Sequence, residues 1–234
     1  MITPLDNPVW EALSSKQSHF KLGNQTLKYF LSNVSPFVGL QNWTETDLQE
    51  LINHLPADRS FSVMIAKEVT LPTSFEIVFT TPLYQLYCPV LNPFANPAIV
   101  CRKLGNADVA QMLELTEMTK PGPFYERTID FGNYVGIFNN DQLVAMAGER
   151  LKVNGYTEVS AICTHPDFLG KGYASFLLSK ISEHIVNEGN IPFLHVKQDN
   201  SRAIDVYKKL GFQIRTDVYF AVFKKTKSYL SIDY

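Results

Sequence analysis

The segment PDFLGKGYASFLLSKI (residues 166–181) places two glycines around a lysine, just where an apolar helical stretch begins. Glycine is a poor helix former, so this spacing requires a reason. The segment before it, YTEVSAICT (156–164), has the pattern of a strand, and so has IPFLHV (191–196) after it. Strand, loop, helix and strand make a βαβ crossover, which favours a parallel strand pair with the helix packed across it.

The glycine loop is well placed to bind an anion. The first amides of a helix have no intrahelical partner, and the helix dipole adds partial positive charge at that end. Gly170 and Gly172 let the backbone approach phosphate oxygens, and Lys171 adds a charge. The loop alone is equally compatible with an ordinary tight turn between a strand and a helix.

Two other kinds of phosphate loop fit less well. A P-loop has the pattern GxxxxGK[ST], whereas Lys171 lies between the glycines and no Ser or Thr directly follows it. A dinucleotide-binding loop has the pattern GxGxxG, whose third glycine is replaced here by Ser175. Asp199 follows the next strand, which keeps this second alternative open.

Composition bounds the classes of function. The chain has 234 residues, 45% of them hydrophobic and 19% charged, which are values of a globular protein. Its 21 Lys and Arg against 23 Asp and Glu argue against a broad nucleic-acid-binding surface. Cys88, Cys101 and Cys163 form no CxxC pair, so neither a disulfide framework nor a metal site is expected. The start lacks the pattern of a signal peptide, and no apolar run approaches about 20 residues. We therefore expect a cytoplasmic protein with no nucleic-acid or membrane partner.

Four prolines divide the chain within the segment 81–100, at Pro82, Pro89, Pro93 and Pro97. Proline lacks a backbone donor and restricts the residue before it, so the segment is expected to hold neither a regular helix nor a central strand. We place a domain boundary here, between a small α+β N-terminal lobe (1–97) and a second domain (98–234).

The second domain shows a regular order of elements. This order predicts an α/β domain with a mixed sheet flanked by helices. The expected strands lie at 98–104, 134–138, 142–153, 156–164, 191–196 and 218–225, and the expected helices at 107–118, 173–189 and 201–210. Asn106 is the expected cap of the first of these helices. The N-terminal lobe contributes a helix at 47–55 and strands at 61–69 and 75–81.

A second motif follows the glycine loop, in DNSRAIDVYKKLGF (199–212). Together the two stretches resemble the GNAT superfamily of N-acetyltransferases. The coenzyme A loop of that family, [QR]-x-x-G-x-[GA], is matched by LGKGYA at Gly172 and Ala174, and Leu169 departs from it at the first position. The family's next signature, N-x-x-A-x-x-x-Y-x-x-x-G-F, is matched at Asn200, Ala203, Tyr207, Gly211 and Phe212. The resemblance covers about residues 98–225, and the two-lobe layout is similar in outline to the glycine N-acyltransferase branch.

The resemblance implies a fold and a donor. The fold is a mixed, mostly antiparallel sheet whose fourth and fifth strands (156–164 and 191–196) splay apart, with the pantetheine of acetyl-CoA in the gap. Acetyl-CoA is then the acetyl donor, and no metal is required. The expected cofactor-binding residues are Ile162, Cys163, Thr164, Leu169, Gly170, Lys171, Gly172, Tyr173, Ala174, Ser175, Asn200 and Arg202.

Two residues are the candidate catalytic groups. By helical spacing alone Tyr207 is a core tyrosine, but the resemblance places the general acid at this position, where a phenol can protonate a departing thiolate. Glu158, 14 residues before Gly172, has the spacing of the catalytic glutamate in the histone-acetylating branch. A neighbouring Glu149 would raise its pKa and suit a base. The alternative is that Glu158 is a cross-strand partner of Arg150 or of Lys152.

The predicted function is N-acetyl transfer from acetyl-CoA to an amine, which attacks the thioester directly. The acceptor is expected to be a small molecule or a peptide, and the protein a monomer or a homodimer. Two alternatives stay open: transfer of a longer acyl group, and a GNAT-like module that binds acyl-CoA without turnover. The acceptor itself is not predicted, because acceptor pockets in such folds come from variable loops.

Overall fold

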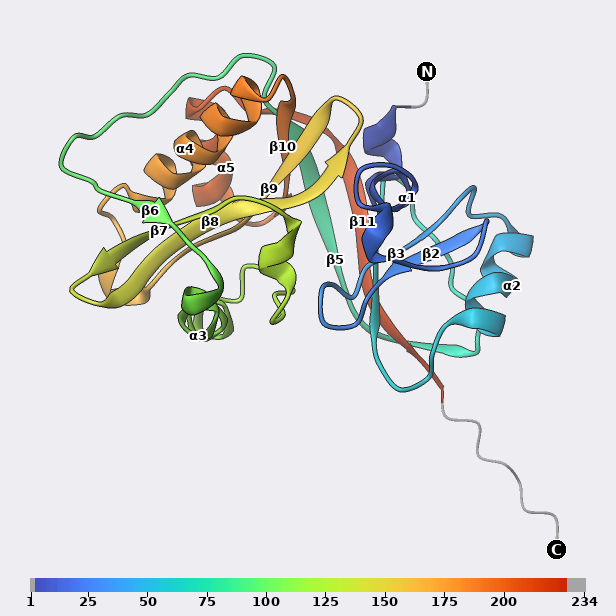
Figure 1. Cartoon of the computed structure of the whole chain (residues 1–234). Helices are drawn as coiled ribbons and strands as arrows, with labels where there is room; N and C mark the ends of the chain where they lie inside the picture. Colours follow the sequence, from blue (N-terminus) through green and yellow to red (C-terminus); the bar gives the residue numbers. More distant parts are fainter. Residues whose placement is uncertain (1–2, 227–234) are drawn as a thin grey trace, which may run out of the picture.

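The computed structural model describes residues 3–226, and within them one large sheet dominates (Figure 1). Its eight strands run in the order β4-β11-β5-β10-β9-β8-β7-β6, with β9 and β10 parallel and all other neighbours antiparallel. This confirms the predicted mixed, mostly antiparallel sheet. The strands are β4 (Phe61–Ile65), β5 (Phe75–Tyr87), β6 (Arg102–Lys103), β7 (Tyr134–Asn139), β8 (Gln142–Val153), β9 (Tyr156–Thr164), β10 (Ile191–Lys197) and β11 (Gln213–Lys225).

Helices and a small second sheet surround the large one (Figure 1). The helices are α1 (Pro8–Ser14), α2 (Glu45–His54), α3 (Val109–Thr119), α4 (Tyr173–Asn187) and α5 (Ser201–Lys209). The second sheet consists of β1 (Lys21–Gly23), β2 (Leu27–Phe30) and β3 (Val38–Leu40). Short 3-10 turns lie at Pro4–Asp6, Ser18–Phe20, Asn106–Asp108, Thr128–Phe131 and Pro166–Phe168.

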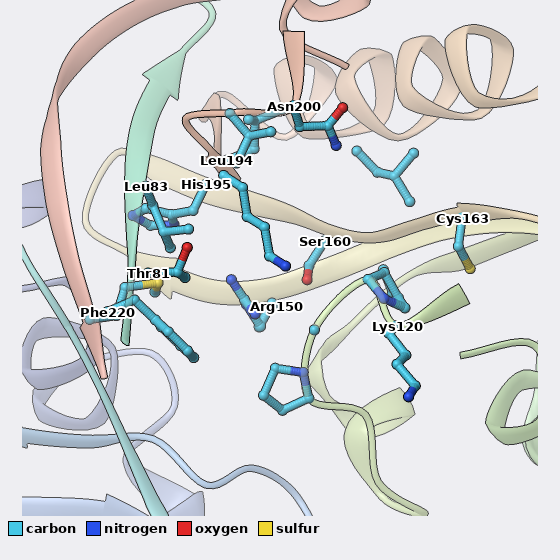
Figure 2. Close-up of a pocket in the computed structure, with 18 of the residues that line it drawn as sticks. Thr81, Leu83, Lys120, Arg150, Ser160, Cys163, Leu194, His195, Asn200 and Phe220 are labelled. Atoms are coloured by element: carbon cyan, nitrogen blue, oxygen red, sulfur yellow. The ribbon is translucent and has the colours of Figure 1, made fainter. Parts of the chain in front are cut away.

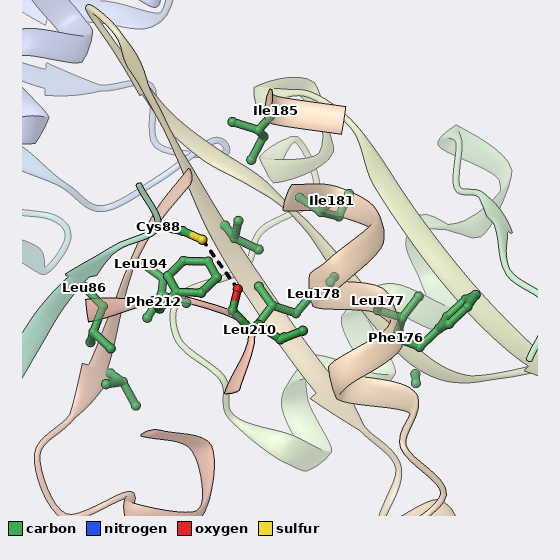
Figure 3. Close-up of a cluster of buried hydrophobic side chains, with 14 of the residues drawn as sticks. Leu86, Cys88, Phe176, Leu177, Leu178, Ile181, Ile185, Leu194, Leu210 and Phe212 are labelled. Atoms are coloured by element: carbon green, nitrogen blue, oxygen red, sulfur yellow. Dashed lines mark hydrogen bonds between the residues drawn. The ribbon is translucent and has the colours of Figure 1, made fainter. Parts of the chain in front are cut away.

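Apolar side chains cover both faces of the large sheet. On one face α4 contributes the buried stripe that the sequence predicted, with Leu177, Leu178, Ile181 and Ile185 packed against β-strand residues such as Leu194 (Figure 3). On the other face the N-terminal segment packs Val9 and Leu13 of α1 with Phe30, Phe131 and Phe193. Because Phe193 and Leu194 are consecutive on β10, the two clusters lie on opposite faces.

The parallel strands separate after three residue pairs. β9 and β10 are paired from Tyr156 and Ile191 to Glu158 and Phe193. Beyond that point β9 continues along β8 as far as Thr164, and β10 continues along β5. This confirms the predicted splayed pair. The separation leaves the facing edges of both strands free to bind an extended ligand.

One expectation about the proline segment is wrong. β5 passes through Pro82 and lies between β10 and β11, so the segment 81–100 does include part of a central strand. The proline is tolerated because pairing with β10 ends at Leu83, and on that side Pro82 uses only its carbonyl, which accepts from the Gln198 backbone N–H at 3.2 Å. Residues 88–101 then join β5 to β6 without a helix or strand. The domain division near residue 97 stays a prediction, but the large sheet contains strands from both sides of it.

Other expectations changed in detail. The strand expected at 98–104 is limited to Arg102–Lys103. The expected cap at Asn106 is wrong, because the side chain of Asp108 accepts the Gly105 backbone N–H at 2.9 Å and also pairs with Arg102. The helix and strands of residues 8–40 were not predicted at all.

Candidate active site

A cavity of about 650 Å³ opens where β9 and β10 separate (Figure 2). Its walls come from the two splayed strands, the start of α5, the segment after α3, and the sheet surface of β4, β5 and β11. The lining residues include Val159 to Thr164, Leu194 to Lys197, Asn200, Tyr207, Thr119 to Pro123, Phe37, Met64, Phe79, Thr81, Leu83, Arg150, Phe220 and Val222. Of the predicted site residues, Ile162, Cys163, Thr164, Asn200 and Tyr207 therefore line one cavity.

The glycine loop lies just beyond the cavity, at the C-terminal end of β9. Gly170 and Gly172 have φ of 80° and 79°, a left-handed conformation that residues with a Cβ rarely adopt. A Cβ at Gly170 would meet nothing within 4 Å, so backbone conformation rather than crowding explains this glycine. Gly172 is the N-cap of α4, and its loop neighbours Leu169, Gly170 and Lys171 are exposed. The loop thus leaves the first amides of α4 available to an anion. The remaining predicted loop residues, Tyr173, Ala174 and Ser175, are half-buried in the first turn of α4, and Arg202 is exposed on α5.

A bulge distorts β9 beside the cavity. Ser160 pairs with Gly148 and Cys163 with Met146, so β9 carries one residue more than β8 over this interval. Ala161 absorbs the extra residue with a φ of 52°, which is rare for alanine. The bulge changes the direction of the β9 backbone at the residues that line the cavity.

Tyr207 and Asn200 bring α5 to the cavity. The Asn200 side chain accepts the Ala203 backbone N–H at 3.1 Å, so the residue caps α5 while lining the cavity. The Tyr207 ring lies 6.2 Å from that of Phe212, centroid to centroid. Burial raises the pKa of the Tyr207 phenol to about 12, which keeps it protonated at neutral pH.

Glu158 forms an ion pair instead of standing free. Both carboxylate oxygens accept from Arg150, with Nε to Oε2 at 2.8 Å and Nη2 to Oε1 at 2.6 Å. Burial by itself would raise the pKa of this carboxyl, but the charge and hydrogen bonds of Arg150, with a further hydrogen bond from His195, lower it to about 2. The expectation of a raised pKa is therefore wrong, and the geometry corresponds to the cross-strand alternative with Arg150.

Glu149 does not approach Glu158. It lies on the opposite face of the sheet, where its carboxylate pairs with Lys152 Nζ at 2.7 Å and accepts the Asn133 backbone N–H at 3.2 Å. The two carboxylates that the sequence suggested as a coupled pair are thus separated by strand alternation. Glu149 brings a ligand atom within 4.8 Å of those of His184 and Glu188, but Lys152 already occupies its carboxylate.

A chain of buried polar groups continues from Glu158 across the sheet. His195 Nδ1 lies 2.7 Å from Glu158 Oε1, and His195 Nε2 lies 3.0 Å from Gln85 Nε2. The Gln85 amide has a fixed orientation, because its oxygen accepts from Arg215 at 2.8 Å and its Nε2 donates to the Leu5 carbonyl at 2.9 Å. His195 Nε2 must then accept, so Nδ1 carries the proton and donates to Glu158.

Sequence reasoning missed this chain of groups, since its members come from β11, β5, β10, β9 and β8. The spacing of residues along the chain carries no signal for such a network. Only the Arg150–Glu158 pair was anticipated, as one of the two cross-strand partners considered for Glu158.

The cavity is lined by basic side chains and by no acidic ones within the described residues. Within residues 3–226 no Asp or Glu lines it, whereas Lys120, Arg150 and Lys197 do. Figure 2 shows Thr81, Arg150 and Ser160 facing the cavity from three different strands. No helix between residues 3 and 226 has the length and apolar character needed to span a membrane.

Comparisons with known proteins agree with this geometry. The family model described as FR47-like protein matches residues 134–221. A structure from Novosphingobium aromaticivorans, described as an acetyltransferase from the GNAT family, is 29% identical, with 96% of this chain and 100% of that chain covered and a TM-score of 0.88. A GCN5-related N-acetyltransferase from Kribbella flavida shares the fold at 16% identity, with 94% and 97% covered and a TM-score of 0.62.

Curated relatives match a shorter segment. An acetyltransferase of Yersinia enterocolitica is 34% identical over 56 residues, which is 23% of this chain and 39% of that protein. One of Pectobacterium atrosepticum is 37% identical over 51 residues, 21% of this chain and 36% of that protein. The match thus spans less than two fifths of the length of these relatives. The FR47-like match, the structural likeness over nearly the whole chain, the splayed strands and the glycine loop at α4 together support membership of the GNAT superfamily of acetyltransferases.

Proposed function

We propose that the protein transfers the acetyl group of acetyl-CoA to an amine acceptor by direct attack. The observation that carries this proposal is the cavity between β9 and β10, which has Tyr207 and Asn200 in its wall. An extended pantetheine arm can pair with the free edges of the two strands. The pyrophosphate then meets the first amides of α4, where Gly170 and Gly172 allow close approach.

Acetyl transfer requires a polarised thioester carbonyl, a protonated leaving sulfur and a neutral amine, and residues of the cavity can meet each requirement. Attack of the amine on the thioester carbonyl creates an oxyanion, and we assign the hydrogen-bond donor for it to a backbone N–H of β9 near the Ala161 bulge. Collapse of the intermediate breaks the C–S bond and leaves a thiolate. Tyr207, still protonated, donates its phenolic proton to that sulfur. The proton that the attacking nitrogen releases as the amide forms then restores the phenol through solvent.

The third demand is a neutral amine, and we assign it to the charge of the cavity. Glu158 is locked to Arg150 and holds strands together instead of accepting the proton. Lys120 and Lys197, with no lining carboxylate within residues 3–226, lower the pKa of a bound ammonium group. The acceptor therefore loses its proton to water before it attacks.

Two measurements test this function. Acetyl-CoA at 100 times its Kd should stabilise the fold by about 2.7 kcal/mol, seen as a higher melting temperature, and NADH should not. A panel of amines with acetyl-CoA should release free thiol and give an N-acetylated product by mass spectrometry. Octanoyl-CoA in the same assay reveals a preference for a longer acyl group. Binding of acetyl-CoA without thiol release from any amine would leave an acyl-CoA-binding module and contradict the proposal.

A further inference from the structure

The part of the cavity wall formed by β5 and β11, which we call the acceptor side, has an apolar floor. Phe79, Thr81 and Leu83 alternate along β5 and all line the cavity, so they share one face of the sheet. Val222 and Phe220 of β11 stand opposite Phe79 and Thr81 and also line it. This face is the one covered by the N-terminal segment, since Leu83 belongs to the cluster that contains α1.

Lys197 places a cation over this floor. It follows His195 by two residues on β10, so both side chains lie on the same face. The Lys197 Nζ lies 5.9 Å from the centroid of the Phe79 ring, and the residue is exposed and lines the cavity.

Arg150 adds a directed donor. Its Nε and Nη2 are engaged by Glu158, while Nη1 makes no hydrogen bond within residues 3–226. Nη1 extends toward the segment after α3, because a Cβ built on Gly122 would lie 3.8 Å from it, and both residues line the cavity. The Arg150–Glu158 pair is neutral as a whole, so Arg150 offers a ligand a hydrogen-bond donor of fixed direction. The net positive charge at this part of the cavity comes from Lys197.

The network behind Arg150 keeps that direction fixed. Glu158 is held by His195, and His195 in turn by Gln85, whose amide is oriented by Arg215. The guanidinium therefore cannot turn without breaking its buried hydrogen bonds to Glu158.

From these contacts we propose that Arg150 and Lys197 form an anion-binding subsite on the acceptor side of the cavity. The acceptor is then an amine that also carries a carboxylate or a similar small anionic group, attached to an apolar body that packs on Phe79 and Phe220. A purely cationic acceptor such as a polyamine would be disfavoured, because within residues 3–226 no carboxylate lines the cavity to pair with its charges. This inference rests on the proposed acetyl transfer and names its substrate class.

A matched pair of acceptors tests the subsite. Phenylalanine and phenethylamine present the same aryl group and a primary amine, but only phenylalanine carries a carboxylate. The test compares the ratio of kcat/KM for the two amines in the native enzyme and in Lys197→Met, so that the intrinsic reactivity of each amine cancels. Lys103→Met, an exposed lysine on β6 outside the cavity, is the control. The shift of melting temperature by acetyl-CoA is followed in every variant.

We expect the native enzyme to prefer phenylalanine and Lys197→Met to reduce this preference about 10–100-fold, the range of one charge-assisted hydrogen bond. Lys103→Met should leave the ratio unchanged. A ratio that favours phenethylamine, or one that Lys197→Met does not alter, overturns the subsite while acetyl transfer stands. If acetyl-CoA binds but neither these amines nor the wider panel are acetylated, the proposed function fails and the subsite falls with it.

Discussion

Arg150 donates hydrogen bonds to both carboxylate oxygens of Glu158, the last residue of β9 that pairs with β10. Glu158 pairs across the sheet with Phe193, the last parallel pair before the strands separate. The ion pair therefore ties β8 to β9 beside the opening of the cavity, while His195 ties β10 to the same carboxylate. Glu158, the candidate base of the sequence analysis, is thus held by Arg150 and His195, and we predict that it positions these strands.

Glu158→Gln tests this positioning role through stability. The substitution leaves the Arg150 charge buried without its partner, and we expect a loss of about 3–5 kcal/mol in the free energy of unfolding, measured in urea. Glu188→Gln, a change at the exposed end of α4, should cost little. Unchanged stability with abolished turnover would mean that Glu158 acts as a base after all.

The same carboxylate predicts an acid limit to stability. The folded-state pKa of Glu158 lies at about 2, below the ordinary value of 4.5 that holds in the unfolded chain. A lowered pKa stabilises the fold above pH 4.5, and this stabilisation disappears as the pH falls from about 5 to about 2. The melting temperature should fall steeply over that range in the native protein and less steeply in Glu158→Gln. Parallel curves for the two proteins would contradict the ion pair.

Sequence reasoning reached the parts of the fold that carry local signals. The strands 142–153 and 156–164 and the helix after Gly172 were predicted closely because periodicity and turn residues specify them. The helix α1 and the strands β1–β3 are short and owe their stability to packing on the large sheet. The sequence therefore contains no local pattern from which they could be predicted. Pro82 was misjudged because its tolerance depends on where β10 ends, a fact of tertiary structure.

Some residues of the candidate site could also be predicted from the sequence, and others could not. The loop glycines and Tyr207 could be predicted because a motif contains them, whereas the sequence could not place Gln85 or Arg215. These residues act through partners on neighbouring strands that are 110 and 130 positions away along the chain.

Gly172→Asp should abolish binding of acetyl-CoA. It puts a carboxylate where the pyrophosphate is expected, at the N-terminus of α4. The control is Gly155→Asp, because Gly155 has a similar φ of 77° but lies in the turn between β8 and β9. A Cβ at Gly155 would meet nothing within 4 Å, and one at Gly172 would meet only the Phe94 ring, in ordinary contact at 3.6 Å. Both variants suffer the same backbone strain, so only Gly172→Asp should lose the rise of melting temperature with acetyl-CoA. Equal loss in both would remove the loop from the binding site.

The connection between β5 and β6 should be the first site of limited proteolysis by chymotrypsin. Val90 and Val100 are 71% and 79% exposed, and Leu91 and Phe94 between them supply cleavage sites. The two fragments should stay together in gel filtration, because β5 remains paired with β10 and β11. Separation of the fragments would show that residues 1–97 form an independent domain.

The most direct test of the mechanism is the single-turnover rate of Tyr207→Phe. The change removes one oxygen and keeps the ring packed beside Phe212, so acetyl-CoA should still raise the melting temperature. If Tyr207 donates the proton to the leaving thiolate, acetyl transfer to an accepted amine should slow by roughly 10²–10⁴-fold. Because the pKa of Tyr207 is about 12, the native enzyme should also show no loss of rate from this group up to pH 10. An unchanged single-turnover rate in Tyr207→Phe would contradict the assignment and make Tyr207 a packing residue.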